Sequence, residues 1–165
     1  LALADGRELV ATDCQGHAIV GPSLAGGLAF LGLHEGRVLA IDLADGAVRW
    51  QVETEAAVAC PPALDGQALY LAGRDRRLRA LALADGGERW SLRTRAGNDS
   101  PPLRLGPHLV VGGGDGRLLI LDPADGSERW RFDCGAPMIA GPVWTGALLV
   151  VACRDGSLFA FGAEP

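Results

Sequence analysis

Short apolar-rich segments, separated by turn residues, follow one another along the whole chain. Asp-Gly pairs such as Asp65-Gly66 and Asp85-Gly86 stand between them. This pair suits a hairpin turn because Gly adopts a positive φ without a Cβ clash. No stretch of ten residues shows the periodicity and caps of a helix. We therefore predict short antiparallel strands, which in one representative stretch are 57–64, 68–73, 77–82 and 88–93.

The same pattern repeats every 40 residues. The tripeptide Ala-Asp-Gly occurs at 4–6, 44–46, 84–86 and 124–126. Four residues after the last three glycines stand Trp50, Trp90 and Trp130, while Val10 has this position in the first copy. Several residue types recur at the same 40-residue spacing without insertions, so the repeat does not arise by chance. Four strands per 40-residue unit are the signature of a β-propeller blade, so the fold class is an all-β propeller of four-stranded antiparallel blades.

Proline assigns the order of the strands within a blade. Pro22, Pro62, Pro102 and Pro142 all stand in the first strand of a unit. Proline cannot donate to a strand ladder and belongs on an edge strand, so we predict that the first strand lines the central channel and the Trp strand lies outside. The last unit, 136–161, has only three strands. We expect the N-terminal strand 7–13 to close this last blade, which removes loose edges.

Composition limits the classes of function. The 165 residues form a single predicted domain, 1–165, with a net charge of −5 and no Lys. A net acidic chain without a basic run is a poor nucleic-acid binder, and the absence of Lys excludes a Schiff-base or P-loop lysine. The apolar runs are far shorter than the roughly 20 residues of a membrane-spanning helix. Because the chain starts without Met and within a repeat, we expect that it was processed or cut from a longer protein.

One column pattern resembles a known family. Ala40, Asp42, Gly46 and Trp50 match the PQQ-like propeller repeat A-x-D-x-x-x-G-x-x-x-W. Two further repeats keep its Gly and Trp with one departure each, and the last unit keeps Ala160 but has Gly162 in place of Asp. The resemblance covers the whole chain. It implies that Trp50, Trp90 and Trp130 pack between neighbouring blades.

The resemblance implies several functions. Related non-enzymatic proteins include an envelope lipoprotein that assists outer-membrane protein assembly, sensor domains of kinases, and the terminal propeller of some acyl-adenylating ligases. Related enzymes are quinone-dependent dehydrogenases, which hold the quinone with calcium and often a disulfide between adjacent cysteines. The cysteines here are Cys14, Cys60, Cys134 and Cys153, with no adjacent pair and no zinc-type spacing. We therefore expect four free thiols, no cofactor, no metal and no catalytic residue.

These points favour a non-catalytic binding scaffold for protein or peptide partners. The alternatives are a fragment of a quinone-dependent dehydrogenase, or an accessory propeller of a larger multidomain enzyme such as an acyl-adenylating ligase. The compartment stays open, because the family resemblance favours the cell envelope while free cysteines favour the cytoplasm.

We predict that partners bind on one edge of the propeller. The connections between blades and the second turn of each blade open on the same side and carry irregular polar residues, whereas the Ala-Asp-Gly turns on the other side are uniform. Binding residues on rigid scaffolds usually lie on such loops. The alternative is that these loops only confer solubility. The candidate binding residues are Asp13, His17, Glu53, Glu55, Arg95, Asn98 and Asp99.

The blades of this chain could be arranged in three ways, two of which are closed rings. A single chain could close as four blades, each turning about 90°, or two chains could exchange the strand 7–13 and form one eight-bladed ring with about 45° per blade. The third arrangement is a piece of a longer propeller. We favour the homodimer, because related proteins make larger rings and strand exchange readily produces closed dimers.

Overall fold

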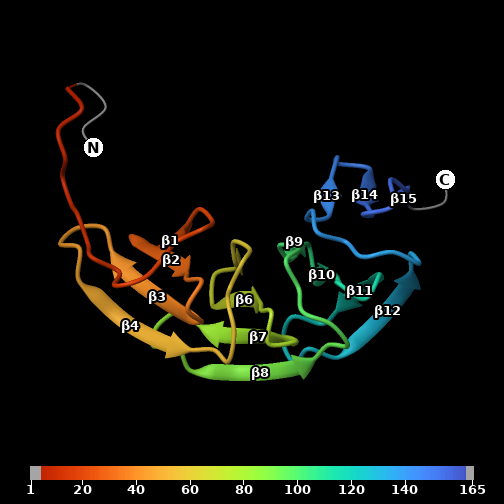
Figure 1. Cartoon of the computed structure of the whole chain (residues 1–165), viewed down its shortest axis with the longest axis horizontal. Coiled ribbons are helices and arrows are strands. Elements are labelled where there is room, and N and C mark those ends of the chain that lie inside the picture. Colours follow the sequence, from red (N-terminus) through yellow and green to blue (C-terminus); the bar gives the residue numbers. More distant parts are fainter. Residues whose placement is uncertain (1–4, 163–165) are drawn as a thin grey trace.

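Four small antiparallel sheets follow one another along an open arc in the computed structural model, which describes residues 5–162 (Figure 1). The first three sheets have four strands each, joined as consecutive hairpins. Within these residues no helix could cross a membrane. The strands are β1 (Ser23–Ala25), β2 (Leu28–Gly32), β3 (Arg37–Asp42), β4 (Val48–Glu53); β5 (Ala63–Leu64), β6 (Ala68–Ala72), β7 (Arg77–Ala82), β8 (Glu88–Arg93); β9 (Leu103–Leu105), β10 (His108–Gly112), β11 (Arg117–Leu121), β12 (Glu128–Asp133); and β13 (Val143–Trp144), β14 (Leu148–Ala152), β15 (Leu158–Gly162).

The prediction of an all-β propeller with four-stranded antiparallel blades is confirmed. The Trp-bearing strands β4, β8 and β12 form the convex side of the arc, and β1, β9 and β13 lie on its concave side (Figure 1). The innermost strands are shorter than predicted: β5 covers only Ala63–Leu64 where 57–64 was expected. Pro61 and Pro62 have no N–H to donate, so regular pairing begins only after them.

Each blade keeps the same register between its two outer strands. In the first blade Ala40 lies opposite Trp50, and a bulge then places Ile41 opposite Val48. The second and third blades repeat this shift. The turn beside it needs a left-handed glycine, as at Gly46 with φ of 75°. The recurring Ala-Asp-Gly tripeptide thus forms the turn that precedes the Trp-bearing strand and, with the bulge, sets its register.

The hydrophobic core lies in a row of junctions between blades. We call the side of a blade toward the next blade along the chain its forward face and the opposite side its backward face. Val38, Leu78 and Leu118 are equivalent forward-face residues, and all three are fully buried. Val38 packs with residues of the second blade such as Leu69 and Leu71. Stability therefore comes from contacts between neighbours, as in other repeat proteins.

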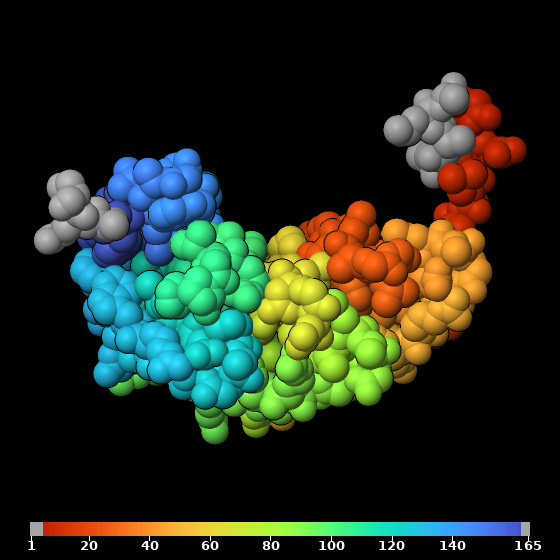
Figure 2. All heavy atoms as spheres, turned by 180° about the vertical axis from the view of Figure 1, so that it is seen from behind, coloured from red at the N-terminus to blue at the C-terminus, as the bar shows by residue number. Residues whose placement is uncertain are grey.

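The predicted closure of the last blade by the N-terminal strand does not form in this structure. Residues 7–13 form no strand and lie beside the first blade, at the opposite end of the arc from β15. There Thr12 donates its hydroxyl to the carbonyl oxygen of Gly46 at 2.7 Å. The last sheet, as described, has the three strands β13, β14 and β15. A space-filling view shows the two ends separated across the concave side (Figure 2). In this structure the four blades span an open arc, and the two ends of the arc do not meet (Figure 1).

Candidate binding face and blade junctions

The repeat tryptophans join neighbouring blades. Trp50 is buried, and its indole N–H donates to the carbonyl oxygen of Leu83 in the next blade at 2.9 Å. Its ring covers Gly86, where an added Cβ would lie 2.8 Å from the indole. Trp90 repeats this arrangement with the carbonyl oxygen of Pro123 at 2.9 Å. These two side chains have a structural role at the junctions.

Trp130, on β12 of the third blade, differs from the other two. Its side chain is 41% exposed, compared with 9% for Trp50. It stacks on Phe132, with ring centroids 6.1 Å apart, and meets the edge of Phe161 at 5.5 Å. The position equivalent to Leu83 is residue 163, outside the described residues. Trp130 therefore contacts Phe161 of the following blade and is covered only in part by the described residues.

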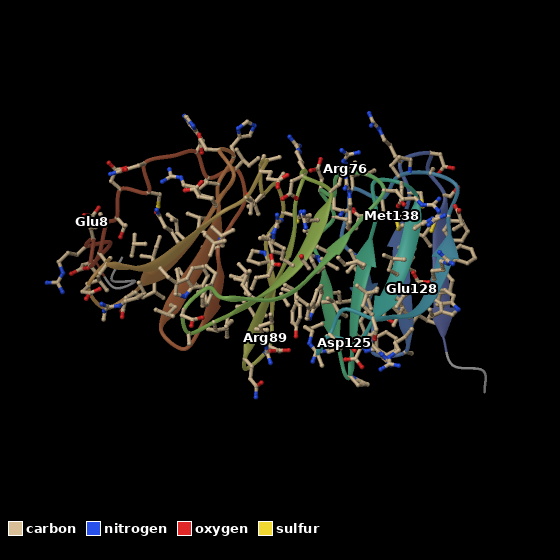
Figure 3. All side chains as sticks on the ribbon, turned by 90° about the horizontal axis from the view of Figure 1, so that it is seen from below. Glu8, Arg76, Arg89, Asp125, Glu128 and Met138 are labelled. Atoms are coloured by element: carbon tan, nitrogen blue, oxygen red, sulfur yellow. The ribbon has the colours of Figure 1, made fainter. Side chains whose placement is uncertain are left out.

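The inter-blade connections and the second turns form one edge of the arc, which we call the loop edge. Arg76, in the turn between β6 and β7, and Met138, in the connection after β12, lie along it, whereas Arg89 and Asp125 lie on the opposite edge (Figure 3). The predicted binding residues all come from elements of the loop edge. Their roles there differ from one another.

Asp13 and His17 lie on the N-terminal segment. The Asp13 carboxylate accepts the backbone N–H of Gln15 at 2.8 Å and so stabilises a local turn. His17 Nδ1 lies 2.5 Å from the Glu35 carboxylate, and the His17 backbone N–H also donates to it at 2.9 Å. These bonds from His17 lower the pKa of Glu35 to about 2. The segment is thus tied to the turn after β2.

Two exposed carboxylates and two exposed guanidinium groups occupy equivalent positions on adjacent blades. Glu53 ends β4 and Glu55 follows it, and both are exposed. One repeat later the same positions hold Arg93 and Arg95, also exposed. The backbone repeats but the charge reverses, which makes these positions suited to distinguish partners of different charge.

Asn98, another predicted binding residue, is fully buried and lies in the wall between two blades. Its amide N–H donates to Thr94 Oγ1 at 3.0 Å, and its side-chain oxygen accepts the backbone N–H of Gly114 at 3.3 Å. Asn98 therefore ties the connection to two blades. Asp99 is engaged by Arg74 through two bonds of 2.7 and 3.0 Å. Sequence position alone could not reveal these partners.

A cavity of about 140 Å³ lies between the second and third blades, open toward the loop edge. Two predicted binding residues, Arg95 and Asn98, line it. Arg117 and Asp115 also line it, and neither is among the candidate binding residues predicted from the sequence. The lining combines apolar side chains with charged ones: Leu92, Val111, Leu119, Arg95, Arg117 and Asp115.

The residue equivalent to Leu119 in the second blade is Arg79, which is buried. Its guanidinium lies 2.5 Å from the carboxylate of Asp75, whose side chain is 1% exposed. Within the described residues, Asp75 Oδ2 and Arg79 Nη1 have no hydrogen-bond partner. A second carboxylate, Glu88, lies 3.5 Å from Arg79. The junction thus contains a buried ion pair where its neighbours contain leucine.

Residues 5–162 contain no group of three or more His, Cys, Asp and Glu side chains placed to hold a metal ion. The four cysteines are free. Cys134 and Cys153, which are 19 positions apart in sequence, come together between the last two blades. Cys134 Sγ also lies 3.9 Å from the sulfur of Met138. Burial raises the pKa of Cys60 and of Cys134 to about 12, with a contact from Cys153 adding to the effect at Cys134.

We predict that the thiols label in two stages. In denaturant without reductant, a maleimide should add four labels per chain. In the native protein at pH 8, half-buried Cys14 should react first, because the raised pKa of Cys60 and Cys134 leaves little thiolate there. Intact-mass spectra over time measure both stages. Two labels in denaturant would contradict the prediction, as would Cys60 reacting before Cys14.

The comparisons with known proteins agree with this architecture. A family profile described as "Outer membrane protein assembly factor BamB" matches residues 1–107 and 96–164. Among curated sequences, none matches the chain significantly. BamB from Moraxella catarrhalis is similar in structure, with a TM-score of 0.83 and 24% identity over 91% of this chain. The chain spans only 48% of that BamB.

Two further structures bear on the length of the arc. The computationally designed Ika4 protein has a TM-score of 0.85 and 15% identity, and the match covers 96% of this chain and 99% of Ika4. A quinohemoprotein alcohol dehydrogenase from Pseudomonas putida HK5 has a TM-score of 0.63 and 24% identity, over 70% of this chain and 20% of the enzyme. At these identities the likeness shows the fold alone.

Proposed function

Since the chain belongs to the family of the outer membrane protein assembly factor BamB, with its PQQ-like propeller repeats, we propose that it is a non-catalytic scaffold that binds protein or peptide partners on its loop edge. The matching family is described as an assembly factor, and the structural match to BamB covers 91% of this chain. Assembly depends on contacts with other proteins, so the same use of the fold is the simplest proposal for this chain.

The observation that carries the proposal is the cavity at the loop edge. Its volume of about 140 Å³ is smaller than the roughly 300–1,000 Å³ typical of cofactor and drug sites, and suits a single side chain. Leu92, Val111 and Leu119 provide apolar lining for an aliphatic group, and Arg95 and Arg117 can pair with a carboxylate beside it. The ligand we propose is therefore a peptide segment with an aliphatic residue next to Asp or Glu.

An array of extended peptides tests this proposal. We expect peptides with an aliphatic–acidic pair to bind best, and Arg95→Glu to weaken their binding about tenfold or more by placing like charges together. Arg89→Glu, on the opposite edge, is the matched control and should leave binding unchanged. Equal losses in both variants would contradict a site at this cavity, and so would peptide binding without preference for the acidic residue.

The alternative enzymatic role is a fragment of a quinone-dependent dehydrogenase. The favouring observation is the structural likeness to the Pseudomonas putida enzyme, of which the chain spans one fifth. Spectroscopic titration of the chain with pyrroloquinoline quinone and calcium separates the two roles. A stoichiometric change in quinone absorbance would support the dehydrogenase and oppose the scaffold.

The proposed scaffold is a homodimer in which two copies form one eight-bladed ring. Two observations support it: the arc has open ends, and the chain spans about half of the BamB it resembles. Light scattering at micromolar concentration should then give twice the chain mass of 17.1 kDa. A mass equal to one chain would exclude the ring, and a mass that keeps rising with concentration would indicate open chains of copies instead.

A further inference from the structure

The forward face of the last blade is built like a buried surface and yet is exposed. Leu158 is equivalent to Val38, Leu78 and Leu118, which are all fully buried, but its side chain is 67% exposed. Leu148, at the other end of the β14–β15 pair, is exposed as well. In the other blades this face packs against the backward face of the next blade. The last blade therefore presents the apolar half of a junction.

The opposite half of a junction is open at the other end of the arc. Leu24 and Leu43 belong to the backward face of the first blade and are 62% and 48% exposed. Their equivalents in the second blade, Leu64 and Leu83, are partly buried against the first blade. The two faces that meet at every internal junction are thus both exposed in part, although Ala29 and Ile41 of the first blade's backward face are buried.

The N-terminal segment lies where the outer strand of a preceding blade would lie. A Cβ added at Gly46 would be 2.9 Å from both Val10 Cγ1 and Thr12 Oγ1. One repeat later, a Cβ added at Gly86 would be 2.8 Å from Trp50 and 3.0 Å from Val52. Residues 7–13 therefore contact the first blade as β4 contacts the second, without a sheet of their own behind them.

We infer that each joint of the two-chain ring forms where β15 of one copy pairs with residues 7–13 of the other, so that the last blade gains its fourth strand and its forward face packs on the partner's first blade. This inference rests on the ring proposed above. The register follows from the repeat: Val38 pairs with Val52 and Ala40 with Trp50 in the first blade. Leu158 then lies opposite Thr12 of the partner subunit, and Ala160 opposite Val10 of the partner subunit.

The joint also defines a partner for Trp130. Trp50 and Trp90 each cover a left-handed glycine of the next blade, Gly86 with φ of 74° and Gly126 with φ of 73°. The next glycine in this column is Gly6 of the partner subunit, and Gly6 already has a φ of 71°. Among residues 5–162 of one chain, nothing lies within 4 Å of a Cβ added at Gly6. In the proposed joint, the exposed indole of Trp130 covers Gly6 of the partner subunit.

A second copy fits this surface better than another occupant. It supplies both missing parts at once, the outer strand and the apolar backward face. Two identical joints then close the ring and leave no sheet edge free, which is the usual outcome of a symmetric exchange. A partner peptide that merely added a strand to β15 would leave Leu24 and Leu43 exposed.

Substitution of Gly6 tests the joint. Gly6→Ala should raise the dimer dissociation constant about tenfold or more, because its Cβ would press on the Trp130 ring of the other copy. Gly106→Ala is the matched control: Gly106 also has a positive φ, 55°, with nothing within 4 Å of an added Cβ. It carries the same backbone strain without the contact, so its dissociation constant should stay within about twofold of the parent value. Sedimentation equilibrium measures all three proteins.

The outcomes separate the joint from the ring. A parent dimer that Gly6→Ala leaves unchanged would overturn this joint while the ring stands. A monomeric parent chain would overturn both. An equal weakening by Gly6→Ala and Gly106→Ala would attribute the effect to strain alone and would also overturn the contact with Trp130.

Discussion

Trp50→Ala is expected to lower the free energy of unfolding by about 3–5 kcal/mol, as for other buried aromatic residues. The change removes the ring that covers Gly86, its contact with Phe30 at a centroid distance of 5.7 Å, and the bond from the indole to Leu83. The cavity would lie between two blades that have few other ways to adjust. Urea unfolding at one fixed protein concentration measures the loss, because ring formation makes stability concentration-dependent.

Two variants control this result. Trp50→Phe keeps an aromatic ring and removes the indole N–H, so it should cost less than the Ala variant, and its own loss should include about 1 kcal/mol for the hydrogen bond. Trp144→Ala removes a tryptophan that is 41% exposed and lies outside the repeat position, with an expected loss of about 1 kcal/mol or less. Equal losses for Trp50→Ala and Trp144→Ala would contradict the role of the repeat tryptophan at the junction.

Asp75→Asn is expected to destabilise the protein by about 3 kcal/mol or more, because it leaves the buried Arg79 guanidinium without its nearest counter-charge. The Asn side chain can still accept the backbone N–H of Arg77, which Asp75 accepts at 3.1 Å, so the turn itself is preserved. Urea unfolding of the variant and the parent measures the difference. The exposed Glu88 is too far, at 3.5 Å, to replace the lost pair fully.

The double variant Asp75→Asn with Arg79→Leu distinguishes a charge effect from damage to the fold. Leucine is what the equivalent positions Leu39 and Leu119 contain, so the double variant should recover most of the lost stability. Arg49→Ala breaks exposed pairs with Asp42 and Asp45 and should cost about 1 kcal/mol or less. A double variant no more stable than Asp75→Asn would show that Arg79 stabilises the junction by packing rather than by charge.

Some residues of the candidate site could be predicted from sequence and others could not. The irregular connection 95–99 predicted the position of a binding site, and Arg95 lines the cavity beside this connection. Asn98 comes from the same connection but is buried, because Thr94 and Gly114 approach it from two different blades. Likewise, Cys134 and Cys153 share no spacing motif, and only the packing of the last two blades brings them together.

The amino-acid sequence by itself determined the fold, the order of strands within a blade and the repeat tryptophans. These features depend on local signals, Asp-Gly turns, prolines and strand periodicity, and each blade contacts only its neighbours. Tertiary structure alone decided the length of the inner strands, the burial of Asn98 and the pairing of Arg79 with Asp75, because these depend on which side chains neighbouring blades bring together. It also decided that residues 7–13 lie against the first blade and not the last. The curvature of the arc sets where the two ends lie, and curvature accumulates over all the junctions rather than being encoded in any one repeat.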